Sequence, residues 1–180
     1  MLVSSIDSHN RNGLANELDS HADTCCAGKN FCMLERPLRH VNVQPYSEEY
    51  KPLQNIPIAN CATVWTDADN GQRYLLVFHE CLFFGNRMDN SLICPNQLRE
   101  NGLTVHDTPK QYDRSSSHSI RIDDLVIPLT MSGVISGFHT DKPSEDDLED
   151  LPRVYMTPNA PWKPYSDDFA ETEKKFRQAA

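Results

Sequence analysis

Positive charge and long apolar runs are both scarce in this sequence. Its 180 residues include 17 lysines and arginines against 26 acidic residues, which gives a formal net charge of −9. Because phosphate contacts need clustered lysine and arginine side chains, direct binding to nucleic acid is not expected. No apolar run approaches the length of a membrane span, so we predict no membrane partner either.

The beginning of the chain lacks the signals of export. Residues 1–16 contain neither the basic patch nor the apolar stretch of a signal peptide. We therefore predict an intracellular, cytoplasmic protein. Thiols stay reduced in that compartment, so the six cysteines are expected to be free. Cys25 and Cys26 are adjacent in sequence, which makes a disulfide between them geometrically unfavourable.

Short apolar segments separated by turns dominate residues 14–109, which is typical of a β domain. Asn70-Gly71 is the strongest turn signal, because this dipeptide readily supplies the positive φ that a tight hairpin needs. Pro95 and Gly102 mark the start and end of one short, late helix. We therefore predict an all-β, small, closed or barrel-like domain with one short helix.

The remaining residues have a different character. Residues 1–13 are polar and are predicted to be a flexible lead-in. Residues 110–180 contain an acidic run, Asp141–Asp150, with six acidic residues and one lysine, which favours a solvated connector. Ser166 is placed to cap a terminal helix. We expect this part to be a linker or appendage that is extended and ends in a short helix.

The stretch with the most chemistry begins at Leu18, where an apolar residue is followed directly by Asp19 and Ser20. A short strand ending in a tight loop would present the carboxylate of Asp19, and a carboxylate held by hydroxyl and N–H donors is suited to acid–base hydrolysis. The same residue types also occur at ordinary turns and helix N-caps, where they satisfy free backbone N–H groups.

A resemblance to a known family rests on two motifs. Asp19-Ser20-His21-Ala22 resembles the Asp-Ser/Thr-Gly-Ala loop of retroviral-type aspartic proteases, and most of all the Copia-type retrotransposon version. Downstream, residues 90–102 resemble the element Asn-Leu-Leu-Ser-x-x-Gln-Leu-x-x-x-Gly of the same polyproteins. The resemblance covers residues 14–109 and implies a retropepsin fold and an aspartic endopeptidase of a Gag-Pol-type polyprotein.

The resemblance also implies roles for particular residues. Asp19 would be the catalytic carboxylate, Ser20 would brace the loop against a partner loop, and Ala22 would allow close packing. The hairpin at Asn70 and Gly71 would be the flap. Leu92-Ile93 and the helix from Pro95 would support the base of the loop. Since the chemistry needs two aspartates and the chain offers one such loop, the partners implied are a second copy of the chain and a polypeptide substrate, with no cofactor.

His21 departs from the family pattern, which has glycine at this loop position. Glycine suits the close approach of backbone there, whereas an imidazole could crowd it or lower the pKa of the aspartate. A catalytically degenerate dimerisation or peptide-binding module is therefore one alternative. A thiol nucleophile, Cys25 or Cys26 with His40 or His79, is another, although no spacing signature supports it.

A metal site is the remaining alternative. Zinc binds cysteine and histidine readily, but the spacing here matches no common zinc motif, and adjacent cysteines are awkward tetrahedral ligands. We therefore predict no metal. The candidate ligands would be Asp19, His21, Asp23, Cys25, Cys26, Cys32 and His40.

Overall fold

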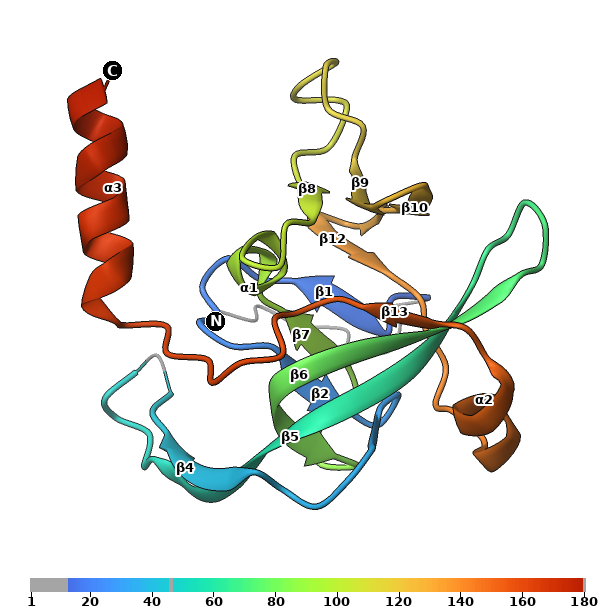
Figure 1. Ribbon diagram of the computed structural model, residues 1–180, viewed down its shortest axis with the longest axis horizontal. Coiled ribbons are helices and arrows are strands. Elements are labelled where there is room, and N and C mark those ends of the chain that lie inside the picture. The colour runs from blue at the N-terminus through green and yellow to red at the C-terminus, as the bar shows by residue number, and fades with distance from the viewer. Residues whose placement is uncertain (1–12, 46, 180) are drawn as a thin grey trace.

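The computed structural model describes residues 13–45 and 47–179, and it is predominantly β (Figure 1). Ten of the described strands form one curled, half-barrel sheet, and three more form a small second sheet. The predicted lead-in, residues 1–13, lies outside the described residues apart from Gly13. The strands are β1 (Asn16–Leu18), β2 (Cys26–Gly28), β3 (Cys32–Met33), β4 (Arg39–Val43), β5 (Leu53–Thr66), β6 (Arg73–Gly85), β7 (Ser91–Ile93), β8 (Thr104–His106), β9 (Ser119–Ile122), β10 (Leu125–Pro128), β11 (Thr130–Ser132), β12 (Ile135–Phe138) and β13 (Arg153–Tyr155).

The large sheet is organised around the long antiparallel hairpin of β5 and β6. Its register runs from the pair of Ile58 and Leu82 to the pair of Thr66 and Arg73. The turn between the strands includes Asn70 and Gly71, as predicted, and Gly71 has a φ of 73° that suits glycine. Consecutive side chains of the middle of β6 are buried, because one face of this strand lies in the main apolar core and the other packs against Leu34, Leu148 and Leu151.

The edge of β6 opposite β5 is shared by two short parallel strands. β13 pairs with β6 from Leu75 to Val77, and β2 pairs with it from Leu82 onward. Between them β6 has a bulge, where the register with β5 shifts and Glu80 adopts a φ of 58°. A left-handed glutamate is an uncommon conformation, and a bulge of this kind redirects the side chain that carries it.

The C-terminal part of the chain completes the sheet, which differs from the linker that we predicted for residues 110–180. β12 pairs antiparallel with β1, and β13 is inserted beside β6. The acidic run forms helix α2 (Glu145–Asp150), which Ser144 caps. Asp147 of this helix makes an ion pair with Arg73 of β6. Strands that pair over such long separations in sequence leave no local signature, so the composition of residues 110–180 alone suggested a connector.

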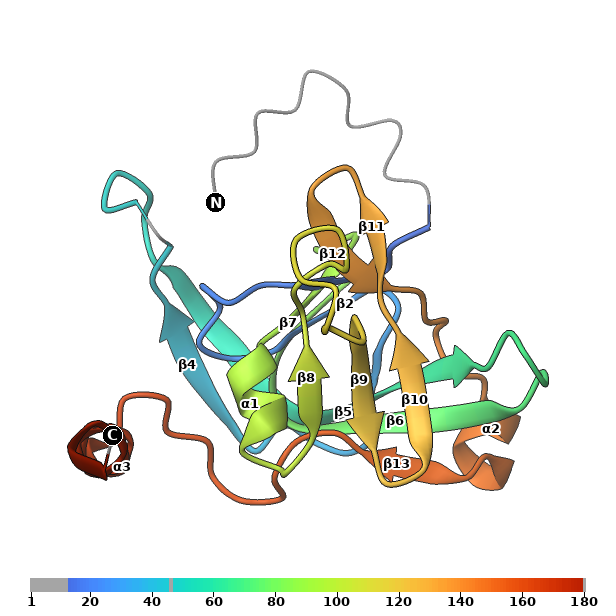
Figure 2. The ribbon, with the colours of Figure 1, turned by 90° about the horizontal axis from the view of Figure 1, so that it is seen from above.

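The other two helices were predicted. Helix α1 (Pro95–Arg99) has its proline in the first turn, and helix α3 (Asp167–Ala179) follows Ser166. Helix α3 buries none of its residues and stands apart from the sheet in both views (Figures 1 and 2). Strands β8, β9 and β10 form the second sheet (Figure 2). Among the described helices, none combines the length and the apolar character that crossing a membrane would require.

Two kinds of buried group hold the half-barrel together. Phe31 and Phe78 meet edge to face in the main apolar core, with ring centroids 5.3 Å apart. A set of buried polar side chains links β1, β5 and β7 to the turn before β3 and the segment after β12, with hydrogen bonds of 2.6–2.9 Å. Such a bonded network favours one strand register over its alternatives. Its members are Asn16, Asn30, Thr63, Ser91 and Thr140.

Candidate functional site

Asp19 follows β1 directly and heads a tight turn. Its backbone N–H donates to the carbonyl of Ile93 at 3.0 Å, at the end of the parallel strand β7. Its Oδ1 accepts a hydrogen bond from the backbone N–H of His21 at 2.9 Å, and its carbonyl accepts one from Ala22 at 3.2 Å. The carboxylate is therefore fixed by main-chain groups, and the side chain remains half exposed.

The tip of this loop faces solvent in the single chain. Ser20 and His21 are both exposed. His21 is not among the described residues that adopt a positive φ, so its backbone conformation does not demand the glycine of the family pattern. The structure brings Asp19, Ser20, His21 and Ala22 into one turn, in which Ser20 and His21 are exposed and Asp19 and Ala22 are half-buried.

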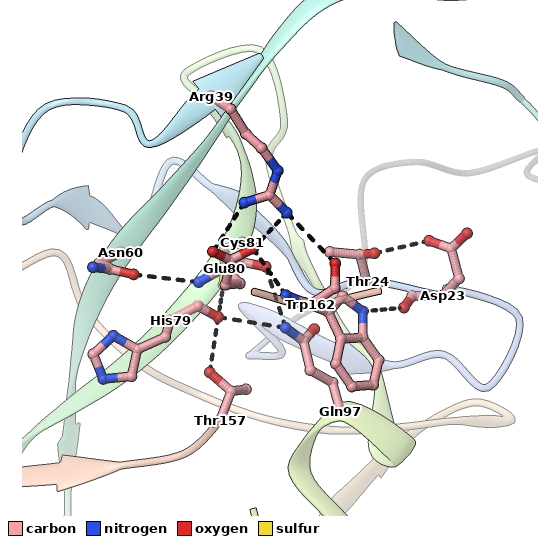
Figure 3. Close-up of polar contacts among 10 residues, drawn as sticks. All are labelled: Asp23, Thr24, Arg39, Asn60, His79, Glu80, Cys81, Gln97, Thr157 and Trp162. Atoms are coloured by element: carbon pink, nitrogen blue, oxygen red, sulfur yellow. Dashed lines mark hydrogen bonds and ion pairs between the residues drawn. The ribbon is translucent and has the colours of Figure 1, made fainter. Parts of the chain in front are cut away.

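The base of the loop is fixed by a buried side chain of α1. Gln97 is fully buried, and its Oε1 accepts the backbone N–H of Cys25 at 2.8 Å. Its Nε2 donates to the carbonyls of Glu80 at 3.2 Å and His79 at 3.4 Å (Figure 3). These carbonyls lie in the stretch of β6 that neither β2 nor β13 covers. Gln97 thus replaces the missing strand and ties the loop to the bulge.

A second contact reaches the loop from the C-terminal part of the chain. The indole N–H of Trp162 donates to the carbonyl of Asp23 at 2.8 Å (Figure 3). The backbone N–H of the same residue donates to Oε2 of Glu80 at 3.1 Å. A hydrogen bond to the Asp23 carboxylate also raises the pKa of Tyr165. Asp23 therefore has structural partners within the chain.

Arg39 completes this polar group. Its guanidinium pairs with both carboxylate oxygens of Glu80, at 2.9 and 2.6 Å (Figure 3). The carboxylate of Glu80 is almost fully buried, whereas Arg39 is partly exposed, and their hydrogen bond raises the pKa of the arginine. A buried carboxylate is stable as an ion only with such a partner.

The predicted flap residues, Asn70 and Gly71, lie away from the Asp19 loop. The backbone N–H of Leu82 donates to the carbonyl of Cys25, which places the loop at one end of the β5–β6 ladder. The turn at Asn70 and Gly71 is at the other end, and Figure 1 shows it on the opposite side from β4. The strands on the side of the loop are β4 and the start of β5, which pair from Arg39 onward.

Thiol chemistry finds little support in the site. Burial is the main cause that raises the pKa of Cys26, and it raises the pKa of Cys94 to about 11. Cys25 is buried, and its Sγ accepts the backbone N–H of Cys94 at 3.3 Å. The ring of His79 stacks on Tyr155, with centroids 5.7 Å apart. Protonated, buried thiols are poor nucleophiles and poor metal ligands.

Sequence reasoning missed three of the residues that shape the site, namely Arg39, Glu80 and Trp162. Gln97 was part of the quoted motif, and the helix from Pro95 was expected to support the loop. Glu80 gave one faint signal, as an acidic residue inside an apolar strand segment.

The described residues contain no group of three or more histidine, cysteine or acidic side chains that could hold a metal ion. Comparison of the chain with protein-family models, curated proteins and solved structures finds no match.

Proposed function

We propose that the protein is an aspartic endopeptidase that acts as a homodimer, with one Asp19 from each chain. The observation that carries the proposal is the held but accessible carboxylate: its Oδ1 is fixed by the N–H of His21, and its backbone by Ile93. A retropepsin-like arrangement is part of the proposal: the loop joins β1 to β2, β7 lies between these strands and parallel to β1, and the short helix α1 follows β7.

The chemistry follows from bringing two like carboxylates together. Two aspartates about 3 Å apart cannot both ionise, so they share one proton. The ionised carboxylate takes a proton from water as that water attacks the peptide carbonyl, and it gives the same proton to the amide nitrogen as the C–N bond breaks. The protonated carboxyl donates its hydrogen bond to the carbonyl oxygen. Neither step needs a cofactor.

The exposed loop tip suits a two-fold contact. Ser20 and His21 are exposed in the single chain, and the loop that carries them has its base buried against Gln97 and Ile93. A symmetric contact through this tip would place the Ser20 hydroxyl against the partner loop and Asp19 against its counterpart. The natural substrate would be an extended polypeptide, with a retrotransposon polyprotein as the expected source.

The test compares Asp19→Asn with Asp23→Asn, which changes a neighbouring carboxylate in the same way. Purified protein is incubated with an unfolded protein substrate and with a peptide library, with and without pepstatin. We expect cleavage by the wild type, loss of cleavage in D19N, and retained cleavage in D23N. Equal loss in both variants, or cleavage that D19N leaves unchanged, would contradict the proposal.

His21 supports a second candidate function, a peptide-binding module without catalysis, because it stands where the family pattern has glycine. In that case the wild type cleaves nothing, yet binds a pepstatin-like extended peptide. Isothermal titration and the cleavage assay, run together on the wild type, distinguish the two, since a binding module binds the peptide without cleaving it, whereas an enzyme cleaves it and loses that cleavage in D19N.

A further inference from the structure

Residues 156–166, called here the strap, lie against the Asp19 loop, residues 19–25. It continues from β13, and its first residues stay bonded to β6: Met156 N–H donates to Val77, and Thr157 Oγ1 to His79. It then leaves the sheet toward α3, as both ribbon views show (Figures 1 and 2). Along this path it passes the part of β6 between β13 and β2.

Trp162 is the point where the strap is held most closely. Its indole N–H, backbone N–H and carbonyl are bound by Asp23, Glu80 and Arg39, at 2.8, 3.1 and 3.5 Å. The indole also packs against Phe169 at a centroid distance of 5.8 Å. One residue of the strap thus touches the Asp19 loop, the β6 bulge and the first residue of β4 (Figure 3).

The bulge at Glu80 lies at this contact. Glu80 sits at a φ of 58°, a strained conformation for a residue with a side chain, which persists only where the surroundings impose it. Its N–H donates to Asn60 Oδ1 at 3.3 Å, and its carboxylate is turned to Arg39 and Trp162. A regular strand would not direct that carboxylate to both partners.

We infer that Trp162 is a positioning residue, through which the strap fixes the Asp19 loop relative to the base of the β4–β5 hairpin. The inference rests on the proposed function for its catalytic consequence. Its structural consequence is independent of catalysis: without the Trp162 contacts, the loop at Asp23 and the hairpin at Arg39 lose their common tether. Gln97 continues to hold the base of the loop at Cys25.

The test uses the full chain with single substitutions. Trp162→Phe removes the indole N–H and keeps an aromatic ring beside Phe169. Trp65→Phe is the matched control, because Trp65 is the other tryptophan and lies near the far end of the β5–β6 hairpin, stacked on Tyr74. A second pair, Arg39→Met and Arg39→Lys, removes or retains the charge that binds Glu80.

Amide hydrogen exchange reads the tether directly. We expect W162F to speed exchange at Ala22, whose N–H is bonded within the loop, by about 2- to 10-fold relative to the rest of the sheet, the range for one lost neutral hydrogen bond. Exchange at Cys25 should change less, because Gln97 still accepts its N–H. W65F should leave the exchange rate of Ala22 relative to the rest of the sheet unchanged. Exchange at Ala22 in R39K should lie between the wild type and R39M. If W162F and R39M match the wild type at Ala22, or speed exchange equally over the whole sheet, the inference is overturned.

Catalysis gives the second readout. For an active wild type, we expect W162F to lower kcat by a similar factor while KM stays within about twofold, because a loosened loop misplaces Asp19 and leaves substrate contacts intact. Unchanged kcat together with faster loop exchange would overturn the catalytic half of the inference. If the wild type cleaves no peptide, the proposed function fails, while the exchange experiment still decides whether the strap holds the loop.

Discussion

Gln97→Leu is the substitution that tests most sharply how the loop is supported. It keeps the approximate size of the side chain and removes three hydrogen bonds. The carbonyl of His79 keeps a partner, since Thr157 Oγ1 still donates to it at 2.8 Å. The buried N–H of Cys25 and the carbonyl of Glu80 lose theirs. Two unsatisfied buried groups cost about 4 kcal/mol.

Burial of the leucine side chain offsets part of that cost. Burying its side chain contributes about 2 kcal/mol, so we expect the free energy of unfolding to fall by about 2 kcal/mol. For a chain of this length, that is a decrease in Tm of about 4–8 °C. Urea denaturation followed by circular dichroism measures the change in the free energy of unfolding. Gln72→Leu is the control, because Gln72 is exposed in the β5–β6 turn region and should change stability by about 0.5 kcal/mol or less. A Q97L protein as stable as the wild type would refute the reasoning.

Three further predictions follow from pKa shifts. Burial lowers the pKa of His79, although the charges of Glu35 and Glu80 oppose the shift. As the pH falls, the unfolded chain therefore takes up a proton at this histidine before the folded chain does, and stability decreases below about pH 6.5. In thermal unfolding between pH 7 and 5, His79→Phe should make this decrease smaller. The hydrogen bond from Arg73 lowers the pKa of Asp147, so Asp147→Asn should lower Tm at pH 7, and the difference should disappear as pH falls through the depressed pKa. Burial raises the pKa of Cys94 to about 11, so mass spectrometry should show slow iodoacetamide labelling of Cys94 at pH 8 in native protein and fast labelling in urea; equal rates would contradict the buried placement.

Local chemistry was enough to predict several elements. Asn70-Gly71 forms a turn, Pro95 starts α1, and Ser166 precedes α3, because each depends on the backbone preferences of a few adjacent residues. The tight turn after the first strand also follows from the order of Leu18, Asp19 and Ser20. Such signals need no information about the rest of the chain.

Long-range pairing could not be predicted in the same way. Nothing near residue 137 indicates that β12 lies beside β1, and nothing near residue 154 indicates that β13 lies beside β6. The β6 bulge at Glu80, and with it the contact to Trp162, depends on that arrangement. The flap prediction failed for the same reason. A hairpin signal identifies a turn at Asn70, but only the register of β5 and β6 shows which end of that hairpin lies beside the Asp19 loop.

The central claim is that two copies of Asp19 form one catalytic site, and a mixing experiment tests it most directly. Wild type and Asp19→Asn are unfolded together in equal amounts, refolded, and assayed for peptide cleavage at constant total protein. If both aspartates are needed, only wild-type homodimers cleave, and about one quarter of the activity remains. If each chain works alone, about one half remains, and that result would contradict the account.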